Sequence, residues 1–183
     1  MVDYVTHVLF VCTGNICRSP FAERYSALLA ASGTLPADWV FSSAGIGAVV
    51  DSEMDAEMAR ELIERGGTPE GFRARQMRHA VLDGVDWIIA MEASQRQWLL
   101  EEYPGRLRQT FTLGQLVAAL PHVPTERVGE AVLVEVGEHR TRARGRDDVP
   151  DPYLRGTTAA ESAAQRIVAD LTAIAARIQG LPD

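Results

Sequence analysis

The chain contains no lysine. Its 18 basic residues are all arginine, and they are outnumbered by 25 acidic residues among 183, so the formal net charge is -7 at pH 7. Nucleic-acid binding depends on neutralising backbone phosphates, and a chain of this charge is not expected to bind DNA or RNA. The missing lysine, together with abundant alanine, is typical of a codon bias rather than of a function.

Cysteine is also scarce. The two residues of this type, Cys12 and Cys17, lie five positions apart on either side of Gly14. A disulfide framework would separate its cysteines to close long loops, and a structural zinc site would need further cysteine or histidine ligands downstream. We therefore expect no metal and no cofactor. Two thiols so close together suggest a role in a reaction rather than in holding the fold together.

No apolar run approaches the roughly 18–20 residues of a membrane span. The run 5–12 is too short, and Asp3 precedes it where a secretory signal would carry basic residues. The sequence therefore predicts a cytoplasmic protein that binds no membrane. A length of 183 residues suits a single domain over 1–183.

Strand and helix patterns alternate along the chain. Strands are expected at 5–11, 39–42, 85–90 and 108–111, and helices at 19–32, 53–65, 93–103 and 158–178. In the first helix, Ser19 is expected to be the N-cap and Pro20 to lie in the first turn. Such alternation predicts an α/β fold with a parallel sheet between helices on both faces.

The segment 121–147 fits this pattern less well. Residues 126–139 can form a helix, although 131–136 could equally be a strand, and we favour the helix. That helix would turn three valines inward: Val128, Val132 and Val136. The arginines that follow at alternate positions are typical of a solvated loop, with docking of an acidic partner as the alternative: Arg140, Arg142, Arg144 and Arg146.

The loop between the first strand and the first helix has the pattern C-x5-R-S, from Cys12 to Ser19. A loop that enters a helix N-terminus can turn its backbone N–H groups into a concave binding site for a tetrahedral oxyanion. Gly14 would permit the positive φ or close approach that a tight loop needs. Arg18 offers a planar fork for two phosphate oxygens. Cys12 would attack phosphorus as a thiolate, to which Ser19 can donate, and form a phosphocysteine.

Hydrolysis also needs an acid for the leaving group. Asp147, Asp148 and Asp151 cluster before the last helix, and Asp151-Pro152-Tyr153 is the distinctive triplet. A carboxylic acid there could protonate the leaving oxygen and then, as a carboxylate, activate water. Spacing alone does not choose among the three aspartates.

Three segments together resemble the low-molecular-weight protein tyrosine phosphatase family over nearly the whole chain: 8–20, 42–45 and 151–153. The resemblance implies a four-stranded parallel sheet in a flavodoxin-like arrangement, strand order 2-1-3-4. It implies hydrolysis of protein phosphotyrosine without a metal or cofactor. Cys12 would be the nucleophile, Arg18 the phosphate clamp and Asp151 the general acid and base.

Supporting roles also follow from the resemblance. The phosphate would lie on Thr13, Gly14, Asn15, Ile16, Cys17 and Arg18. Asn15 and Ser43 would brace that loop, Ser19 would assist the thiolate, and Tyr153 would form one wall of the slot for a phenyl ring.

The sequence departs from the family at three places. Val49 and Val50 replace an aromatic wall that relatives often carry, Glu92 replaces a common aspartate, and 121–147 looks longer than usual. We expect these departures to affect substrate choice and not the chemistry.

Other functions remain open at this point. An arsenate reductase on the same scaffold would have to use a small cellular thiol, because no downstream cysteine pair is present. A protein-arginine phosphatase is the second alternative. Relatives with that activity have a threonine at the position of Ile16, and the apolar Ile16 favours phosphotyrosine instead. A phosphopeptide-binding module without turnover would lack one of the three catalytic residues, and none is missing. Cys17 could also form a reversible disulfide that protects Cys12 from overoxidation.

Overall fold

Four parallel strands form the centre of the molecule, whose computed structural model describes residues 5–139 and 142–180. They are β1 (His7–Cys12), β2 (Val40–Gly45), β3 (Trp87–Ala90) and β4 (Thr110–Thr112). Their spatial order is β2-β1-β3-β4, so the expected order 2-1-3-4 is confirmed. The register places Cys12 opposite Gly45 at the end of β1, which fixes where the loops after these strands meet.

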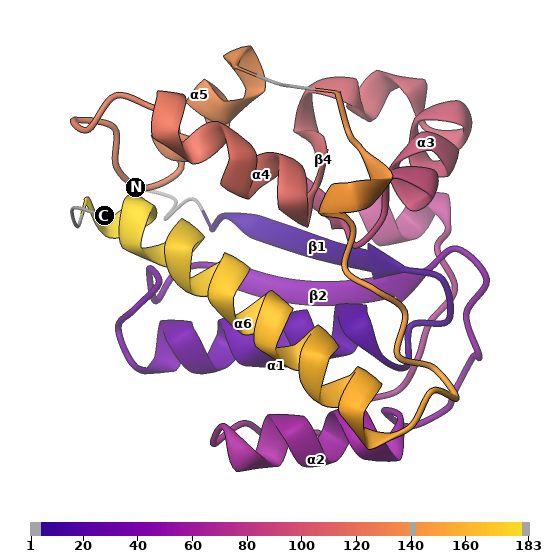
Figure 1. The fold of residues 1–183 in the computed structure, drawn as a ribbon. Helices are drawn as coiled ribbons and strands as arrows, with labels where there is room; N and C mark the ends of the chain where they lie inside the picture. The colour runs from indigo at the N-terminus through magenta and orange to yellow at the C-terminus, as the bar shows by residue number, and fades with distance from the viewer. Residues whose placement is uncertain (1–4, 140–141, 181–183) are drawn as a thin grey trace.

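Helices cover both faces of this sheet (Figure 1). The α-helices are α1 (Arg18–Ala31), α2 (Ala56–Glu64), α3 (Ala93–Glu102), α4 (Leu113–Ala119), α5 (Ala131–Glu138) and α6 (Thr157–Gln179). Short 3-10 helices are η1 (His79–Leu82), η2 (Pro104–Gln109), η3 (Leu120–His122) and η4 (Gly145–Asp147). Within the described residues, no helix has the length and apolar character needed to cross a membrane.

The side chains of β1 alternate between two apolar clusters, as the period of a strand requires. Val8 and Phe10 pack into a large cluster with α1, α4, α5 and α6. Leu9 and Val11 pack into a smaller one with β3 and with Leu99 of α3. Burial on both faces explains why this strand is a continuous apolar run in the sequence.

Helix α5 confirms the helix favoured for 126–139, although it is shorter. Val132 and Val136 are buried as expected, but Val128 lies before the helix and its side chain is 51% exposed. Of the four alternating arginines, Arg142, Arg144 and Arg146 are exposed, and Arg140 lies outside the described residues. The exposed three agree with a solvated loop.

One local expectation was wrong, and one helix was not anticipated. Helix α1 begins at Arg18 with Cys17 in the N-cap position, because the Ser19 hydroxyl bonds the Cys12 sulfur instead of capping the helix. Helix α4 was not anticipated. It begins directly at the end of β4, where the Thr112 hydroxyl accepts a hydrogen bond from the Gln115 amide and the Gln115 side chain accepts one from the Thr112 amide.

Helix α6 holds the large cluster together, and Ile167 at its centre is fully buried. We expect Ile167→Ala to lower the free energy of unfolding by about 3 kcal/mol, because a buried cavity replaces packed methyl groups. Urea denaturation with an unchanged m-value would measure this. The control Ile63→Ala, at a 58% exposed position on α2, should change stability by less than about 0.5 kcal/mol. Equal losses in the two variants would contradict the assigned core.

Candidate active site

The loop 13–17 joins the end of β1 to the start of α1. Its carbonyl oxygens are turned outward. Those of Cys12, Thr13, Gly14 and Ile16 accept hydrogen bonds from backbone N–H groups in the segment 46–55, at 2.8–3.0 Å. In a planar trans peptide the C=O of one residue and the N–H of the next point in opposite directions. The following N–H groups therefore turn to the inner side of the loop, where they can bind an oxyanion.

The left-handed residue of the loop is Asn15, with φ 53°, and not Gly14, which has no positive φ. Asparagine tolerates this conformation better than most residues. The glycine that the loop strictly requires is Gly45 in β2, because a Cβ there would lie 2.5 Å from the Thr13 carbonyl oxygen. Gly14 therefore has neither of the two roles expected for it. Asn15 adopts the positive φ, and Gly45 of β2 allows the close approach of the backbone.

The Asn15 side chain is completely buried and organises the loop from behind. Its Oδ1 accepts from the Arg75 amide at 2.8 Å, which orients Nδ2 to donate to Ser19 Oγ at 2.9 Å and Ser43 Oγ at 2.8 Å. Each hydroxyl then has its single proton left for another acceptor. Ser19 lies 3.0 Å from Cys12 Sγ, so the arrangement favours a sulfur that accepts, as a thiolate does.

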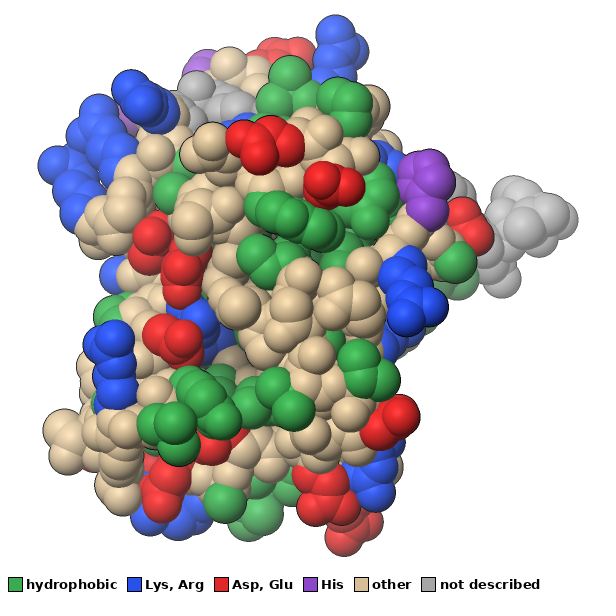
Figure 2. Space-filling view, turned by 90° about the vertical axis from the view of Figure 1, so that its right-hand side faces the viewer, with side chains coloured by type: hydrophobic (Ala, Val, Ile, Leu, Met, Phe, Trp, Pro, Cys, Tyr) green, Lys and Arg blue, Asp and Glu red, His purple; other side chains and the backbone are tan. Residues whose placement is uncertain are grey.

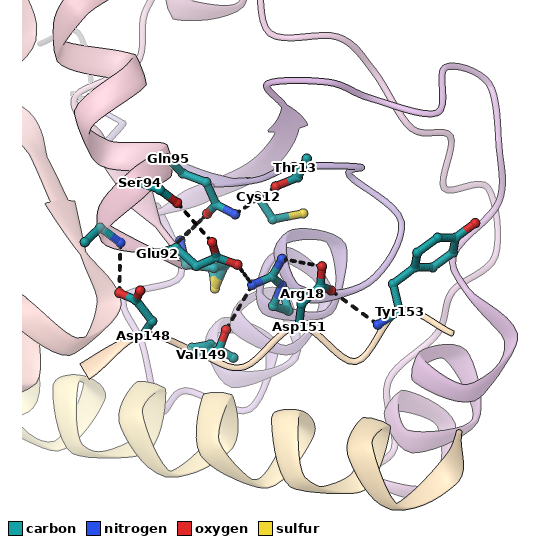
Figure 3. A network of polar contacts seen from close by, with 12 residues as sticks. Cys12, Thr13, Arg18, Glu92, Ser94, Gln95, Asp148, Val149, Asp151 and Tyr153 are labelled. Atoms are coloured by element: carbon teal, nitrogen blue, oxygen red, sulfur yellow. Dashed lines mark hydrogen bonds and ion pairs between the residues drawn. The ribbon is translucent and has the colours of Figure 1, made fainter. Parts of the chain in front are cut away.

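The guanidinium of Arg18 is 2% exposed, and a buried cation needs partners. Nη1 donates to Glu92 Oε1 and, at 2.9 Å, to the Val149 carbonyl oxygen, while Nη2 lies 3.2 Å from Asp151 Oδ2 (Figure 3). Glu92, one of the three departures from the family pattern, therefore contacts the expected phosphate clamp, and its effect on substrate choice stays a prediction. Arg18 Nε finds no hydrogen-bond partner among the described residues.

The three aspartates that spacing could not separate have different positions. Asp151 lines the cavity above Cys12. Asp148 Oδ1 accepts from the Ala93 amide at the start of α3, at 2.8 Å, and burial raises the pKa of this carboxyl. Asp147 pairs with Arg146 at the surface, 3.7 Å apart.

A cavity of about 210 Å³ opens over the loop. Its floor and walls come from segments far apart in the sequence: Cys12, Thr13, Gly14, Ile16, Cys17, Arg18, Gly47, Val49, Asp151 and Tyr153. Figure 2 looks onto this end of the molecule and shows a basic side chain among acidic ones in a hollow with hydrophobic side chains beside it. Asn15, Ser19 and Ser43 do not line the cavity but support it from below.

Cys17 is 4% exposed, and burial, helped by the negative charges of Asp55, Cys12 and Asp151, raises the pKa of its thiol. It is therefore a protonated thiol and a poor nucleophile. Cys12 is also buried but has different neighbours, with a hydroxyl beside its sulfur and a helix N-terminus after it. The two thiols of one loop are in this way chemically distinct.

Sequence reasoning missed four contacts. Glu23 accepts from Ser43 Oγ at 2.6 Å, the Arg75 amide holds Asn15, and Gln95 Nε2 donates to Thr13 Oγ1 at 3.2 Å. Glu92 is the fourth. The Glu92-x-x-Gln95 spacing is a helix-start signal that could have drawn attention to this junction, whereas nothing local marks Glu23 or Arg75.

Comparison with known proteins agrees with this geometry. A family model described as "Low molecular weight phosphotyrosine protein phosphatase" matches residues 7–125. The chain belongs to this family. It is accordingly a protein phosphatase, a hydrolase.

Several relatives of this phosphatase are similar over most of their length. The low molecular weight protein-tyrosine-phosphatase YfkJ of Bacillus subtilis is 35% identical over 150 residues, covering 81% of each chain. A protein-arginine-phosphatase of Geobacillus stearothermophilus is 34% identical over 111 residues, 61% of this chain and 71% of the other. The solved low molecular weight protein tyrosine phosphatase of T. tengcongensis superposes with a TM-score of 0.71 at 29% identity, covering 92% of this chain and 97% of that one.

The partly buried Glu23 makes the support of the loop sensitive to pH. Burial raises the pKa of Glu23 above its ordinary value of 4.5, although the Ser43 hydrogen bond and two arginines oppose the shift. A raised carboxyl pKa means that the folded state holds the proton more tightly than the unfolded state does. Stability is then lost as pH rises from about 4.5 through the folded-state pKa. We expect Glu23→Gln to gain stability relative to wild type over this rise.

Thermal unfolding of the two proteins between about pH 4 and pH 8 would measure this gain. The control is Glu53→Gln, whose carboxylate is 78% exposed and pairs with Arg73 at the surface. It should show no comparable trend. A constant offset between wild type and Glu23→Gln at every pH would contradict the prediction.

Proposed function

We propose that this phosphatase hydrolyses phosphotyrosine in proteins through a phosphocysteine intermediate, without a metal or cofactor. The observation that carries the proposal is the convergence of Cys12, Arg18 and Asp151 on one cavity whose floor is a loop of inward-facing N–H groups. A nucleophile, a cationic clamp and an acid around an oxyanion site are the groups that transfer of a phosphoryl group to sulfur requires.

In the first step the Cys12 thiolate attacks phosphorus, and the bond from phosphorus to the tyrosyl oxygen breaks. Arg18 and the loop N–H groups bind the equatorial oxygens, whose charge grows in the transition state. Asp151 donates its proton to the departing oxygen. The Ser19 hydroxyl, 3.0 Å from the sulfur, stabilises the thiolate before attack and after it is released.

In the second step water attacks the phosphorus of the phosphocysteine. The Asp151 carboxylate takes a proton from this water, and the sulfur–phosphorus bond breaks. Asp151 lines the cavity and its side chain is 43% exposed, which supports both of these roles. Its contact with Arg18 Nη2 is one that a phosphate oxygen can take over, because the oxygens compete for the same donor. Substrate would thus free the carboxyl to face the leaving group.

The walls above the phosphate suit a flat ring. Tyr153 forms one side, and Val49 and Ile16 contribute apolar surface around the opening. The wall at Val49 is aliphatic, so the slot holds the ring with less stacking than an aromatic pair would provide. We infer a phosphotyrosine-containing protein as substrate, in the cytoplasm, with neither nucleic acid nor membrane as a partner and residues 1–183 acting as one phosphatase domain.

The test is phosphate release from a phosphotyrosine peptide in the presence of EDTA. We expect Cys12→Ser to abolish turnover, because an alcohol at this position is a far weaker nucleophile than a thiolate. Asp151→Asn should lower kcat by about 10²–10⁴, since it cannot donate or accept the proton. The control Asp148→Asn, whose side chain bonds the start of α3, should stay within a few-fold of wild type. Similar losses in the two aspartate variants would contradict the role of Asp151, and inactive folded wild type would contradict the proposal itself.

Arginine phosphatases among the relatives make phosphoarginine the second candidate substrate. Ile16 is the residue of the cavity that bears on this choice, because it is apolar and lines the site. We expect Ile16→Thr to raise phosphoarginine turnover relative to phosphotyrosine by about fivefold, roughly the effect of one added hydrogen bond to the attacking water. Ile16→Val is the matched control, because valine has the shape of threonine without its hydroxyl. Parallel kcat/KM measurements on the two substrates give the ratio, and an equal ratio in both variants would contradict the assignment.

A further inference from the structure

Leu154 is the most exposed of the large hydrophobic side chains among the described residues, at 85%. It lies in a turn from Pro152 to Arg155, closed by the Arg155 amide donating to the Pro152 carbonyl oxygen at 3.0 Å. Leu154 is the third residue of this turn and has φ 57°. That corner normally takes glycine or asparagine when φ is positive.

Neither the backbone nor the core explains a leucine here. A left-handed conformation disfavours a residue with a Cβ by about 1–2 kcal/mol, and the side chain recovers nothing by burial because it points into solvent. Strained backbone that persists at an exposed position is found mostly at sites that contact ligands. The combination therefore points to a partner that covers Leu154.

The turn is held rigidly beside the cavity. Before the turn, the Val149 amide donates to the Met91 carbonyl oxygen at 3.0 Å. Within the same segment, Asp151 accepts from the Tyr153 amide at 3.2 Å (Figure 3). At the other end Thr157 Oγ1 donates to Glu57 Oε2 of α2 at 3.0 Å. Since Tyr153 lines the cavity, Leu154 is fixed directly outside its wall.

A second turn beside the cavity has a similar construction. Val49 lines the cavity and opens a second turn, closed by the Ser52 amide donating to the Val49 carbonyl oxygen at 3.1 Å. Asp51 is its left-handed corner, with φ 64°, and Val50 before it is 53% exposed. Two apolar turns therefore border the opening, and Figure 2 shows hydrophobic side chains gathered beside the hollow.

We propose that Leu154 is a specificity-determining residue, which binds an apolar side chain next to the phosphotyrosine of the substrate. This inference rests on the proposed function. A phosphotyrosyl chain whose ring enters the cavity must lay the neighbouring residues across the two turns, so Leu154 and Val50 are continuous with the substrate-binding surface. An apolar neighbour covers the exposed leucine surface at no cost in hydration, whereas a charged or amide neighbour must give up part of its hydration to cover the same surface.

The experiment compares phosphotyrosine peptides that differ only in the residue adjacent to phosphotyrosine, leucine or glutamine, placed before it in one pair and after it in another. Wild type should prefer the leucine peptide of at least one pair by about three- to tenfold in kcat/KM, the effect expected from partly burying one leucine. Leu154→Asn should abolish that preference. Asparagine suits a left-handed corner, so the variant should unfold at the same or a higher temperature.

The control Leu107→Asn changes a leucine that is 50% exposed on η2 and does not line this cavity, and it should keep the wild-type preference. A Leu154→Asn variant that also keeps the preference would overturn the inference. Hydrolysis of p-nitrophenyl phosphate, which has no neighbouring residues, tests the proposed function separately. If wild type fails on this substrate, the proposed function falls and the inference falls with it.

A second copy of the chain would be another way to cover Leu154. Sedimentation at assay concentration should give the same oligomeric state for wild type and Leu154→Asn. A wild-type dimer that Leu154→Asn dissociates would overturn the inference, because the leucine would then serve an interface between copies.

Discussion

The buried charge of Arg18 is the constraint around which the site is built. A guanidinium that is 2% exposed is tolerated only with carboxylates and carbonyl oxygens around it. Its partners come from the junction of β3 with α3, which supplies Glu92, and from the late segment that supplies Val149 and Asp151. Arg18, the expected phosphate clamp, thus also holds Glu92 and the segment 149–151 close to Cys12.

The late segment has further attachments that fix its path. The Val149 amide donates to the Met91 carbonyl oxygen at 3.0 Å, and the Val149 side chain is fully buried. Asp148 bonds the start of α3 at the adjacent position. With these contacts in place, the chain reaches Asp151 at the mouth of the cavity and continues into the turn that exposes Leu154. The residue proposed as the acid and the residue proposed to contact the substrate therefore belong to one short segment that is anchored at Val149.

Below the cavity, Asn15 holds the loop 13–17 in place by hydrogen bonds, as Arg18 holds Val149 and Asp151. Its amide orients two serine hydroxyls, one toward the Cys12 sulfur and one toward Glu23. A network of this kind specifies geometry only when every member is satisfied. The consequence is a loop whose N–H groups are held ready for an anion without reorganisation, which is the condition under which such donors are most effective.

Much of this followed from the sequence. Continuous apolar strands alternating with helical patterns predict a parallel sheet, and the C-x5-R-S loop between a strand and a helix predicts an oxyanion site with a thiolate. These are local properties, set by hydrogen bonding and side-chain periodicity within short segments. The start of α1 was misjudged because Ser19 bonds a residue seven positions back and not its own helix.

What only the tertiary structure decided involves residues far apart in the chain. Spacing could not separate Asp147, Asp148 and Asp151, and only the family resemblance pointed to Asp151, because a local pattern does not say which of the three lies beside Arg18. Glu92 could not be recognised as a partner of Arg18, since 74 positions separate them. The exposure of Leu154 likewise depends on a turn whose position is set by contacts with α1 and α2. Local patterns carry no information about such pairs, because their geometry exists only once the sheet and helices have packed.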